Sequence, residues 1–186
     1  MVSSKKWIMP LWIVVIWTVA LAAIGVEAQN AARPHLDEGA KKLWKPGDST
    51  FAVNAAQSSI GEVQLGELAS HNAGDPVLKA FGRQMAGDHS KINDQLTAIA
   101  AIRNMTLPAT MTAKQQALYD KLQNLTGRDF DKAYIAGMVK EHEQDVGEFR
   151  REASRGQDDR IKSFASETLP VLEGHLQKIK SIHSGT

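Results

Sequence analysis

The stretch LKAFGRQMAGDHSKINDQL, residues 78–96, decides the fold, because its large apolar side chains recur every three or four residues. This period places them on one face of an α-helix, and that face must be buried against other helices. The same period recurs over about residues 51–71, 128–154 and 158–182, and more briefly over 113–125. No alternation typical of a strand appears, so the sequence predicts an all-α protein.

Turn signals separate the helical stretches. Asp75 and Pro76 follow Gly74, and they suit a helix cap and a first helical position. The segment 104–112 contains a proline and breaks the period, whereas Gly156 suits a helix end. Pro170 lies inside the last stretch and should kink or split that helix. The pattern predicts a ferritin-like up-down four-helix bundle over residues 48–183, with one additional short crossing helix and one extended connection.

The first 28 residues predict export. Lys5 and Lys6 precede an apolar run over residues 8–26, and a small-residue cleavage site ends at Ala28. The alternative is an uncleaved anchor, because that run is close to the roughly 20 residues that cross a bilayer. In either case we expect the protein to be periplasmic or otherwise exported, and in the second case to be membrane-anchored by residues 8–26. We interpret residues 29–47 as a tether.

The charge balance bears on partners. The chain has 22 Lys and Arg against 21 Asp and Glu, so it carries almost no net charge. Nucleic acids and anionic membranes attract proteins with a basic excess, so we expect no nucleic acid partner and no strong anionic-membrane binding by the mature domain. A protein partner is not identified by the sequence. The chain has no cysteine, which excludes thiol chemistry and thiolate metal sites.

Each long helix carries one ionisable residue on its apolar face, namely Glu62, His89, His142 and His175. Each lies near the middle of its helix at a rise of about 1.5 Å per residue, so the four can meet in one layer. Buried ionisable groups must hydrogen-bond each other or bind a ligand. Two interpretations stay open. One is a closed Glu–His network that sets helix register, and the other is a site where three imidazoles and a carboxylate bind Zn, Fe, Mn or Cu.

Other side chains flank this layer. Met85 and Met138 each lie one turn from a histidine, and we expect them to be core residues. If the long connection spans the bundle, both thioethers lie on one side of the layer, where they can offer soft ligands to Cu(I). Asp88 is a candidate partner for an imidazole, whereas Glu141 and Glu143 are expected to be solvated. No helix carries the Glu-x-x-His pair of di-iron bundles, so oxygen-activating di-iron chemistry is not expected.

An ordered series of residues resembles the bacterial family named domain of unknown function 4142, and the similarity runs over about residues 51–182. The residues that carry it are Phe51, Ala55, Ala56, Glu62, Leu65, Ala69, Val77, Lys79, Phe81, Met85, Asp88, His89, Leu107, Pro108, Phe130, Asp131, Tyr134, Met138, His142, Leu169, Pro170, His175 and Leu176. The resemblance implies an exported ferritin-like bundle and supplies no function. One departure is Gly82, where the family pattern has Ala, and we expect it to loosen its helix by up to about 1 kcal/mol.

Two functions follow as hypotheses. The first is a non-enzymatic envelope or stress-related interaction protein, in which the Glu/His layer is structural. The alternative is a periplasmic metal-binding protein that uses Glu62, His89, His142 and His175 as ligands. The chain shows no nucleophile elbow, no phosphate loop and no His-Glu-x-x-His zinc motif, so no catalytic residue is assigned. A non-enzymatic role is favoured, and a hydrolase or oxidase built on the same layer stays open as a third hypothesis.

Overall fold

The computed structural model describes residues 44–185, and the side chains of residues 44–182. Over this range the regular elements are helices, and no strand is formed. The elements, in chain order, are α1 (Pro46–Asn72), α2 (Pro76–Ile102), α3 (Ala113–Leu122), α4 (Gly127–Arg155) and α5 (Asp159–Gly185). The prediction of an all-α protein with four long helices and one short helix is confirmed.

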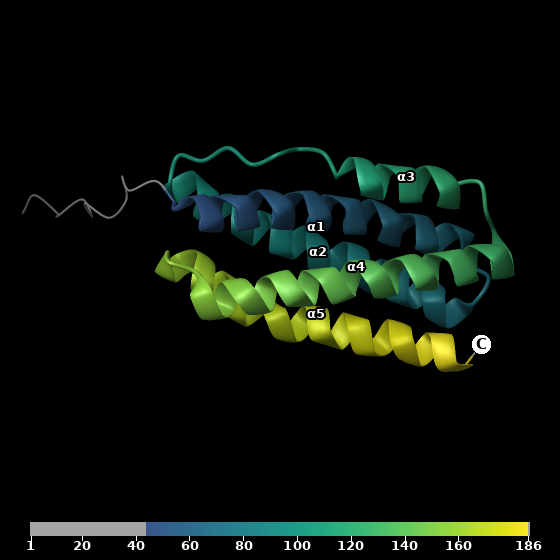
Figure 1. The fold of residues 1–186 in the computed structure, drawn as a ribbon. Helices are drawn as coiled ribbons and strands as arrows, with labels where there is room; N and C mark the ends of the chain where they lie inside the picture. Colours follow the sequence, from purple (N-terminus) through teal and green to yellow (C-terminus); the bar gives the residue numbers. More distant parts are fainter. Residues whose placement is uncertain (1–43, 186) are drawn as a thin grey trace, which may run out of the picture. The chain divides into compact units, whose positions relative to one another are not determined.

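The four long helices form two antiparallel hairpins that pack against each other (Figure 1). Helix α1 pairs mainly with α2, and α4 pairs mainly with α5. Residues 103–126, which include α3, return along the outside of α1 to the end where α2 began (Figure 1). Helices α2 and α4 therefore run in the same direction, as the ferritin-like arrangement requires.

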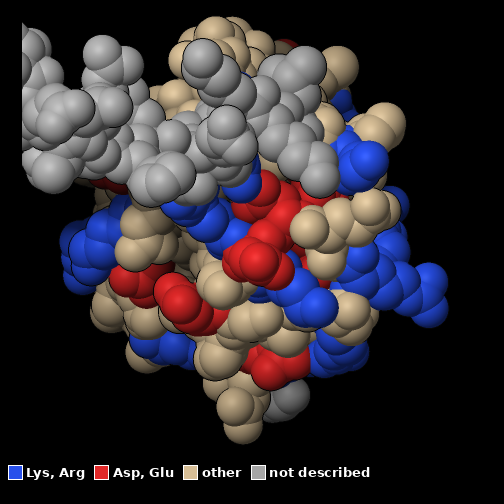
Figure 2. All heavy atoms as spheres, turned by 90° about the vertical axis from the view of Figure 1, so that its left-hand side faces the viewer, with Lys and Arg blue, Asp and Glu red and all other residues tan. Residues whose placement is uncertain are grey.

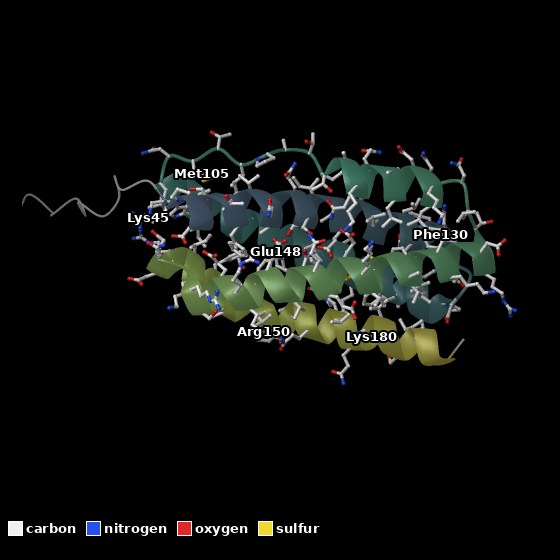
Figure 3. All side chains as sticks on the ribbon, in the orientation of Figure 1. Lys45, Met105, Phe130, Glu148, Arg150 and Lys180 are labelled. Carbon is white, nitrogen blue, oxygen red and sulfur yellow. The ribbon has the colours of Figure 1, made fainter. Side chains whose placement is uncertain are left out.

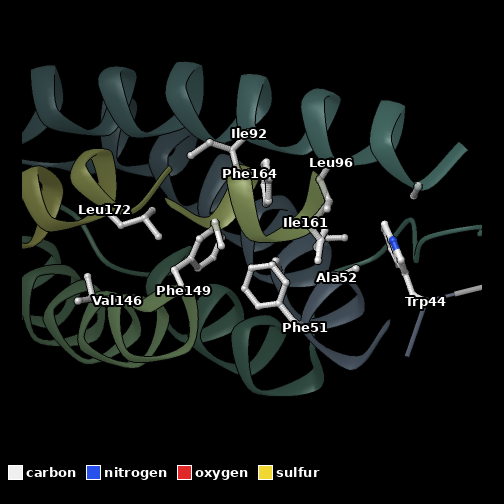
Figure 4. Close-up of a cluster of buried hydrophobic side chains, with 14 residues drawn as sticks. Trp44, Phe51, Ala52, Ile92, Leu96, Val146, Phe149, Ile161, Phe164 and Leu172 are labelled. Atoms are coloured by element: carbon white, nitrogen blue, oxygen red, sulfur yellow. The ribbon is translucent and has the colours of Figure 1, made fainter. Parts of the chain in front are cut away.

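Two apolar clusters fill the interior. One cluster includes Phe51, Phe149 and Phe164, whose rings meet edge-on or tilted at centroid distances of 4.9 to 6.4 Å (Figure 4). The other includes Phe81 and Phe130 near the opposite end of the bundle. On every long helix the ionisable residue of the predicted layer falls between members of the two clusters. The polar layer thus lies across the middle of an otherwise apolar core.

The N-terminal boundary of the bundle lies earlier than expected. Helix α1 begins at Pro46, because proline is preorganised for the first helical position and needs no amide partner there. Trp44 is 7% exposed and packs in the first apolar cluster (Figure 4). Residues 44–47, expected in the tether, therefore belong to the folded unit. The predicted signal peptide, residues 1–28, and the rest of the tether lie outside the described residues.

Two further features differ from the expectations for single helices. Helix α5 is not split at Pro170, whose position is exposed, so that the ring lies at the solvent side and one missing amide is tolerated. Gly156 ends α4 with φ of −54° rather than in the left-handed conformation. Within residues 44–185, no helix combines the length and the apolarity that a membrane crossing requires.

Gly82 has a packing role that the sequence did not reveal. A Cβ atom at this position would lie 2.6 Å from the carbonyl oxygen of Gly66 on α1, and a Cβ at Gly66 would lie 2.6 Å from that of Gly82. The two glycines allow α1 and α2 to approach closely where they cross. The sequence-based expectation covered the effect of Gly82 on its own helix, and it did not predict that the missing side chain permits the contact with α1.

Candidate metal centre

The four predicted layer residues come together in the middle of the bundle. Glu62 comes from α1, His89 from α2, His142 from α4 and His175 from α5. Their exposed fractions are 0%, 1%, 0% and 2%. The apolar period of each helix directs these side chains inward together with their apolar neighbours, so the layer is a direct consequence of helical spacing.

The three imidazole rings form a compact triangle. The ring centroids of His89, His142 and His175 lie 5.5 to 5.7 Å apart. One ring nitrogen can be chosen from each histidine such that all three lie within 4.8 Å of one another. Among residues 44–182, this is the group of three or more His, Cys, Asp or Glu side chains whose geometry suits a metal ion.

Two of the three imidazoles have one nitrogen occupied by an acceptor. Nδ1 of His142 lies 3.1 Å from the carbonyl oxygen of Met138, which can only accept, so this nitrogen carries the proton. Nε2 of His175 lies 3.1 Å from Oδ2 of Asp88 and is likewise the donor. The remaining nitrogens, Nε2 of His142 and Nδ1 of His175, therefore carry lone pairs, and both are buried without a partner.

Glu62 lies beside the rings of His89 and His142. Its Oε2 is 3.0 Å from Nδ1 of His89, and its Oε1 is 3.3 Å from Nδ1 of His142. Neither approach has the alignment of a hydrogen bond, since Nδ1 of His89 and Oε1 of Glu62 have no hydrogen-bond partner. Nε2 of His89 is also buried without a partner. Each histidine of the triangle thus keeps at least one unpartnered nitrogen.

Burial keeps the imidazoles neutral. It lowers the pKa of His89 to about 4 and, together with the neighbouring histidines, lowers that of His142 to about 3. The pKa of His175 is also lowered, first by burial and then by His89. Neutral imidazole is the form that binds metals, so at neutral pH all three rings are ready to act as ligands.

A second carboxyl group supports Glu62. Ser58 donates a hydrogen bond of 2.8 Å to Oδ2 of Asp145 and lies 3.4 Å from Oε2 of Glu62, and the two carboxyl groups are hydrogen-bonded to each other. Burial raises the pKa of Glu62 to about 8 and raises that of Asp145 well above its usual value. Burial therefore favours the protonated form of both acids.

The flanking residues were predicted with mixed success. Asp88 contacts an imidazole, as expected. Glu143 is exposed and pairs with Lys180, but Glu141 is only 7% exposed and lies 2.6 Å from Lys114, so its assignment as a solvated charge was wrong. The reason is that α3, which contributes Lys114, covers this face of α4.

Asp145 and Tyr134 were missed as members of the polar layer. Asp145 follows His142 by three residues, a spacing that places both on one face of α4, and this signal was available in the sequence. Tyr134 is fully buried, its hydroxyl has no partner, and its pKa is raised by burial and by the charge of Glu62. The Tyr134 hydroxyl therefore belongs to the same polar environment.

Chemically, the layer offers neutral imidazole nitrogens whose lone pairs accept no hydrogen bond. Lone pairs of buried nitrogens require a proton donor or a cation, and three such nitrogens converge here. The second nitrogen of His142 or His175 is fixed by an oxygen acceptor, which is the usual arrangement behind histidine ligands in proteins.

Met85 and Met138 meet the condition set from the sequence. Because α2 and α4 run in the same direction (Figure 1), both lie on the same side of the histidine layer. Both are fully buried and belong to the second apolar cluster.

Solved structures share this helical fold. A DUF305 protein from Streptomyces coelicolor is 13% identical with a TM-score of 0.64, and the match covers 73% of this chain and 89% of that one. A DUF305 fragment from Deinococcus radiodurans is 9% identical with a TM-score of 0.69, over 78% of this chain and 100% of that one. CopM in its Cu(I)-bound form is 14% identical with a TM-score of 0.61, over 74% and 96%.

Comparison by sequence gives the family. No curated protein matches the chain at a significant level. The family described as domain of unknown function DUF4142 matches residues 32–182, which includes the whole bundle except the last residues of α5. The resemblance noted from individual residues is confirmed, and the chain belongs to the DUF4142 family.

Proposed function

We propose that this protein binds a transition-metal ion at the buried layer, with His89, His142 and His175 as ligands. The observation that carries the proposal is that each imidazole keeps a buried nitrogen without a hydrogen-bond partner. An unpaired buried polar atom costs about 1–3 kcal/mol, and a metal ion would satisfy all three nitrogens at once.

In this proposal Glu62 orients His89. Its Oε2 lies 3.0 Å from Nδ1 of His89, so a small rotation makes it a hydrogen-bond acceptor there, while the carbonyl oxygen of Met138 accepts from Nδ1 of His142, and both Nε2 atoms are left for the ion. Asp88 has the same role toward His175. Two carboxylates near the site also offset the charge of a cation in a core of low dielectric.

The spacing of the nitrogens fits a modest closure. Ligand nitrogens at about 2.0–2.1 Å from a tetrahedral zinc ion lie about 3.4 Å apart, so separations of up to 4.8 Å require shifts of about 1 Å. Rotations about side-chain bonds supply such shifts. Zn²⁺ and Cu⁺ impose no strong geometric preference and suit three imidazoles, and the neighbouring Met85 and Met138 favour including Cu⁺ among the ions tested. Cu(I) is also the ion with which CopM was captured.

The interpretation of the layer as a closed Glu–His network has less support. Such a network would pair its buried nitrogens, yet the unpartnered atoms include Nε2 of His89 and Nε2 of His142. An interaction protein would also present an apolar face. On the described surface the exposed large hydrophobic residues are Val77 and Ile102, at opposite ends of α2, and Val171 on α5.

Elemental analysis tests the proposal. The protein is purified without a polyhistidine tag, beside the His142→Ala variant and a matched control, His71→Ala, which removes an exposed histidine from α1. About one equivalent of metal in the wild type and the control, but not in His142→Ala, supports the site. If the wild type stays metal-free after reloading with Zn²⁺ and, under reduction, with Cu⁺, the proposal is wrong.

Export is the second half of the proposal. It is supported by the charged, apolar and small-residue segments that precede residue 29, and by a bundle that begins well after them, at Pro46. Intact mass measurement of protein recovered from the periplasm tests it. A mass that corresponds to a chain beginning at Gln29 supports cleavage, whereas a full-length chain in the membrane fraction supports the anchor.

A further inference from the structure

A surface hollow lies directly outside the buried layer. It has a volume of about 220 Å³ and lies between α1, α4 and the segment that leads into α3. The residues that line it are Asn54, Ser58, Thr112, Lys114, Gln115, Glu141, Gln144, Asp145 and Glu148. Figure 3 labels Glu148, one of these lining residues, on α4.

The hollow is lined by acidic groups. Glu141, Asp145 and Glu148 contribute three carboxyl groups from successive turns of α4, of which Asp145 favours the protonated form because of its burial, against the single ammonium group of Lys114. That ammonium group lies 2.6 Å from Oε1 of Glu141, so its charge is already compensated. A cation near this surface is therefore attracted, whereas an anion is repelled.

The floor of the hollow leads to the histidines through a chain of oxygen atoms. Ser58 and Asp145 line the hollow and are hydrogen-bonded to each other at 2.8 Å. Both are also hydrogen-bonded to Glu62, which is fully buried one layer deeper. Glu62 in turn lies 3.0 and 3.3 Å from two imidazoles of the triangle. No apolar side chain needs to intervene between the hollow and the layer along this chain.

The outer wall of the hollow is formed by the first turn of α3. Gln115 of α3 is buried against Gly61, where a Cβ atom would lie only 2.5 Å from its Cδ, and it donates to the carbonyl oxygen of Ser58 at 3.2 Å. The first turn of α3 is also held to α4 through Lys114. Gln115 thus closes the hollow toward α1 through polar contacts.

We propose that this acidic hollow is the entrance through which a cation reaches the histidine layer, passing Asp145 and Glu62. The inference rests on the proposed metal-binding function and adds a route to it. Carboxylate oxygens are ligands for hard and borderline cations, so each carboxyl group of the chain offers a step toward the nitrogen donors.

Metal association kinetics test the route. Stopped-flow mixing of the metal-free wild-type protein with Zn²⁺ gives the association rate constant, and equilibrium competition gives the dissociation constant. Glu148→Gln and Glu141→Gln each remove a carboxylate of the hollow, and Glu141→Gln also leaves Lys114 uncompensated. We expect association to slow by up to about 10-fold, most in Glu141→Gln, with a smaller change in affinity.

Glu167→Gln is the control, because this glutamate is an exposed residue of α5 that does not line the hollow. A steric variant, Asn54→Trp, narrows the mouth and should slow association and dissociation alike, with the affinity kept.

Three outcomes decide the inference. Association rates that match the wild type in the hollow variants overturn the entrance. Slowing of the same size in Glu167→Gln overturns it as well, because that carboxylate does not line the hollow. A wild-type protein that binds neither Zn²⁺ nor Cu⁺ refutes the proposed function itself, and is distinguished because no association is seen in any variant.

Discussion

The α1–α2 and α4–α5 hairpins close onto each other by the same contact made twice. Asp48, in the first turn of α1, accepts hydrogen bonds from the backbone amides of Gln157 and Asp158 at 3.1 and 2.9 Å. Asp131, near the start of α4, accepts from the two corresponding amides of the α1–α2 turn at 2.9 and 3.0 Å. Each hairpin therefore caps the turn of the other, at opposite ends of the bundle. Figure 2 views the end that contains Asp48, where acidic and basic side chains intermingle.

The hairpins differ in their middle. The first contributes Glu62 and His89 to the polar layer, whereas the second contributes His142, Asp145 and His175. The two ends are built alike, because at each end one aspartate accepts hydrogen bonds from two turn amides. These contacts hold the two hairpins together. In the middle of the bundle the two hairpins contribute different residues. A layer that served only to fix the register of the helices would not require three histidines with unpartnered nitrogens.

The largest expected effect comes from metal removal, which tests the middle alone. A metal at about 1,000 times its dissociation constant adds about 4 kcal/mol to the free energy of unfolding, because only the native layer binds it. Denaturant unfolding with and without chelator measures this increment. His142→Ala should abolish it, whereas Asp131→Asn, at the end of the bundle, should lower the overall stability and keep the increment. Loss of the increment in both variants would show that the ends and the middle are not separate.

The next effect tests how closely each hairpin packs. Gly82→Ala places a Cβ 2.6 Å from the carbonyl oxygen of Gly66, so we expect a loss of about 1–3 kcal/mol despite the better helix propensity of alanine. Gly87→Ala on the same helix is the matched control, because nothing lies within 4 Å of its added Cβ, and it should stabilise by about 0.5–1 kcal/mol. Thermal and urea unfolding measure both. Equal stabilisation by the two substitutions would contradict the close crossing of α1 and α2.

A smaller effect compares the two capping aspartates. Asp131→Asn and Asp48→Asn each weaken two charge-assisted hydrogen bonds, and we expect each to cost about 1–2 kcal/mol. The cost should be lower at Asp48, because its carboxylate faces Glu152 and the substitution relieves that repulsion. Urea unfolding of the two variants at pH 8 gives the comparison. A larger loss from Asp48→Asn would mean that the ends are not equivalent in the way described.

The smallest effect concerns pH at one end. Burial, and then the hydrogen bond to Asp48, raise the pKa of Glu152 to about 7, above its usual 4.5. The protonated carboxyl therefore stabilises the native state fully below pH 4.5, and this contribution is lost as pH rises through about 7. Metal-free wild type should lose stability from pH 5 to pH 8 relative to Glu152→Gln, which keeps a neutral side chain throughout. A constant difference between the two proteins over that range would contradict the raised pKa.

Within residues 44–182, the other end of the bundle has no carboxyl at the position that corresponds to Glu152. The carbonyl oxygen of Glu152 accepts from the amide of Gly156, the residue that ends α4. The corresponding residue of α1 is Ala69, whose carbonyl oxygen accepts from the amide of Ala73. Substitution Ala69→Ser should consequently leave the pH profile unchanged, and this serves as the control for the previous measurement.

The helices and the four layer residues were predictable from the sequence because both follow from one period. Apolar residues recur along one face of each helix, and Glu62, His89, His142 and His175 interrupt that face at positions near mid-helix. The cap at Asp75 was likewise local, and its side chain accepts from the amide of Val77.

The parts that were not predicted depend on contacts between distant segments. Gln115 and Glu141 are buried only because α3 lies against the bundle. The sequence of α3 has no strong apolar face from which this packing could be predicted. The role of Gly82 depends on a second glycine across the helix pair, and the role of Asp48 depends on a turn that follows more than one hundred residues later. Periodicity describes one helix at a time and carries no information about such pairings.

The burial of Trp44 makes the protein suited to optical measurement. The chain has four tryptophans, and the other three, Trp7, Trp12 and Trp17, precede the predicted cleavage site. A chain that begins at Gln29 would therefore emit from one tryptophan, packed in the apolar cluster at the end of the bundle where Asp48 caps the opposite hairpin. Its fluorescence would report the docking of the two hairpins, while metal uptake in the middle would be followed by a separate signal in the same sample.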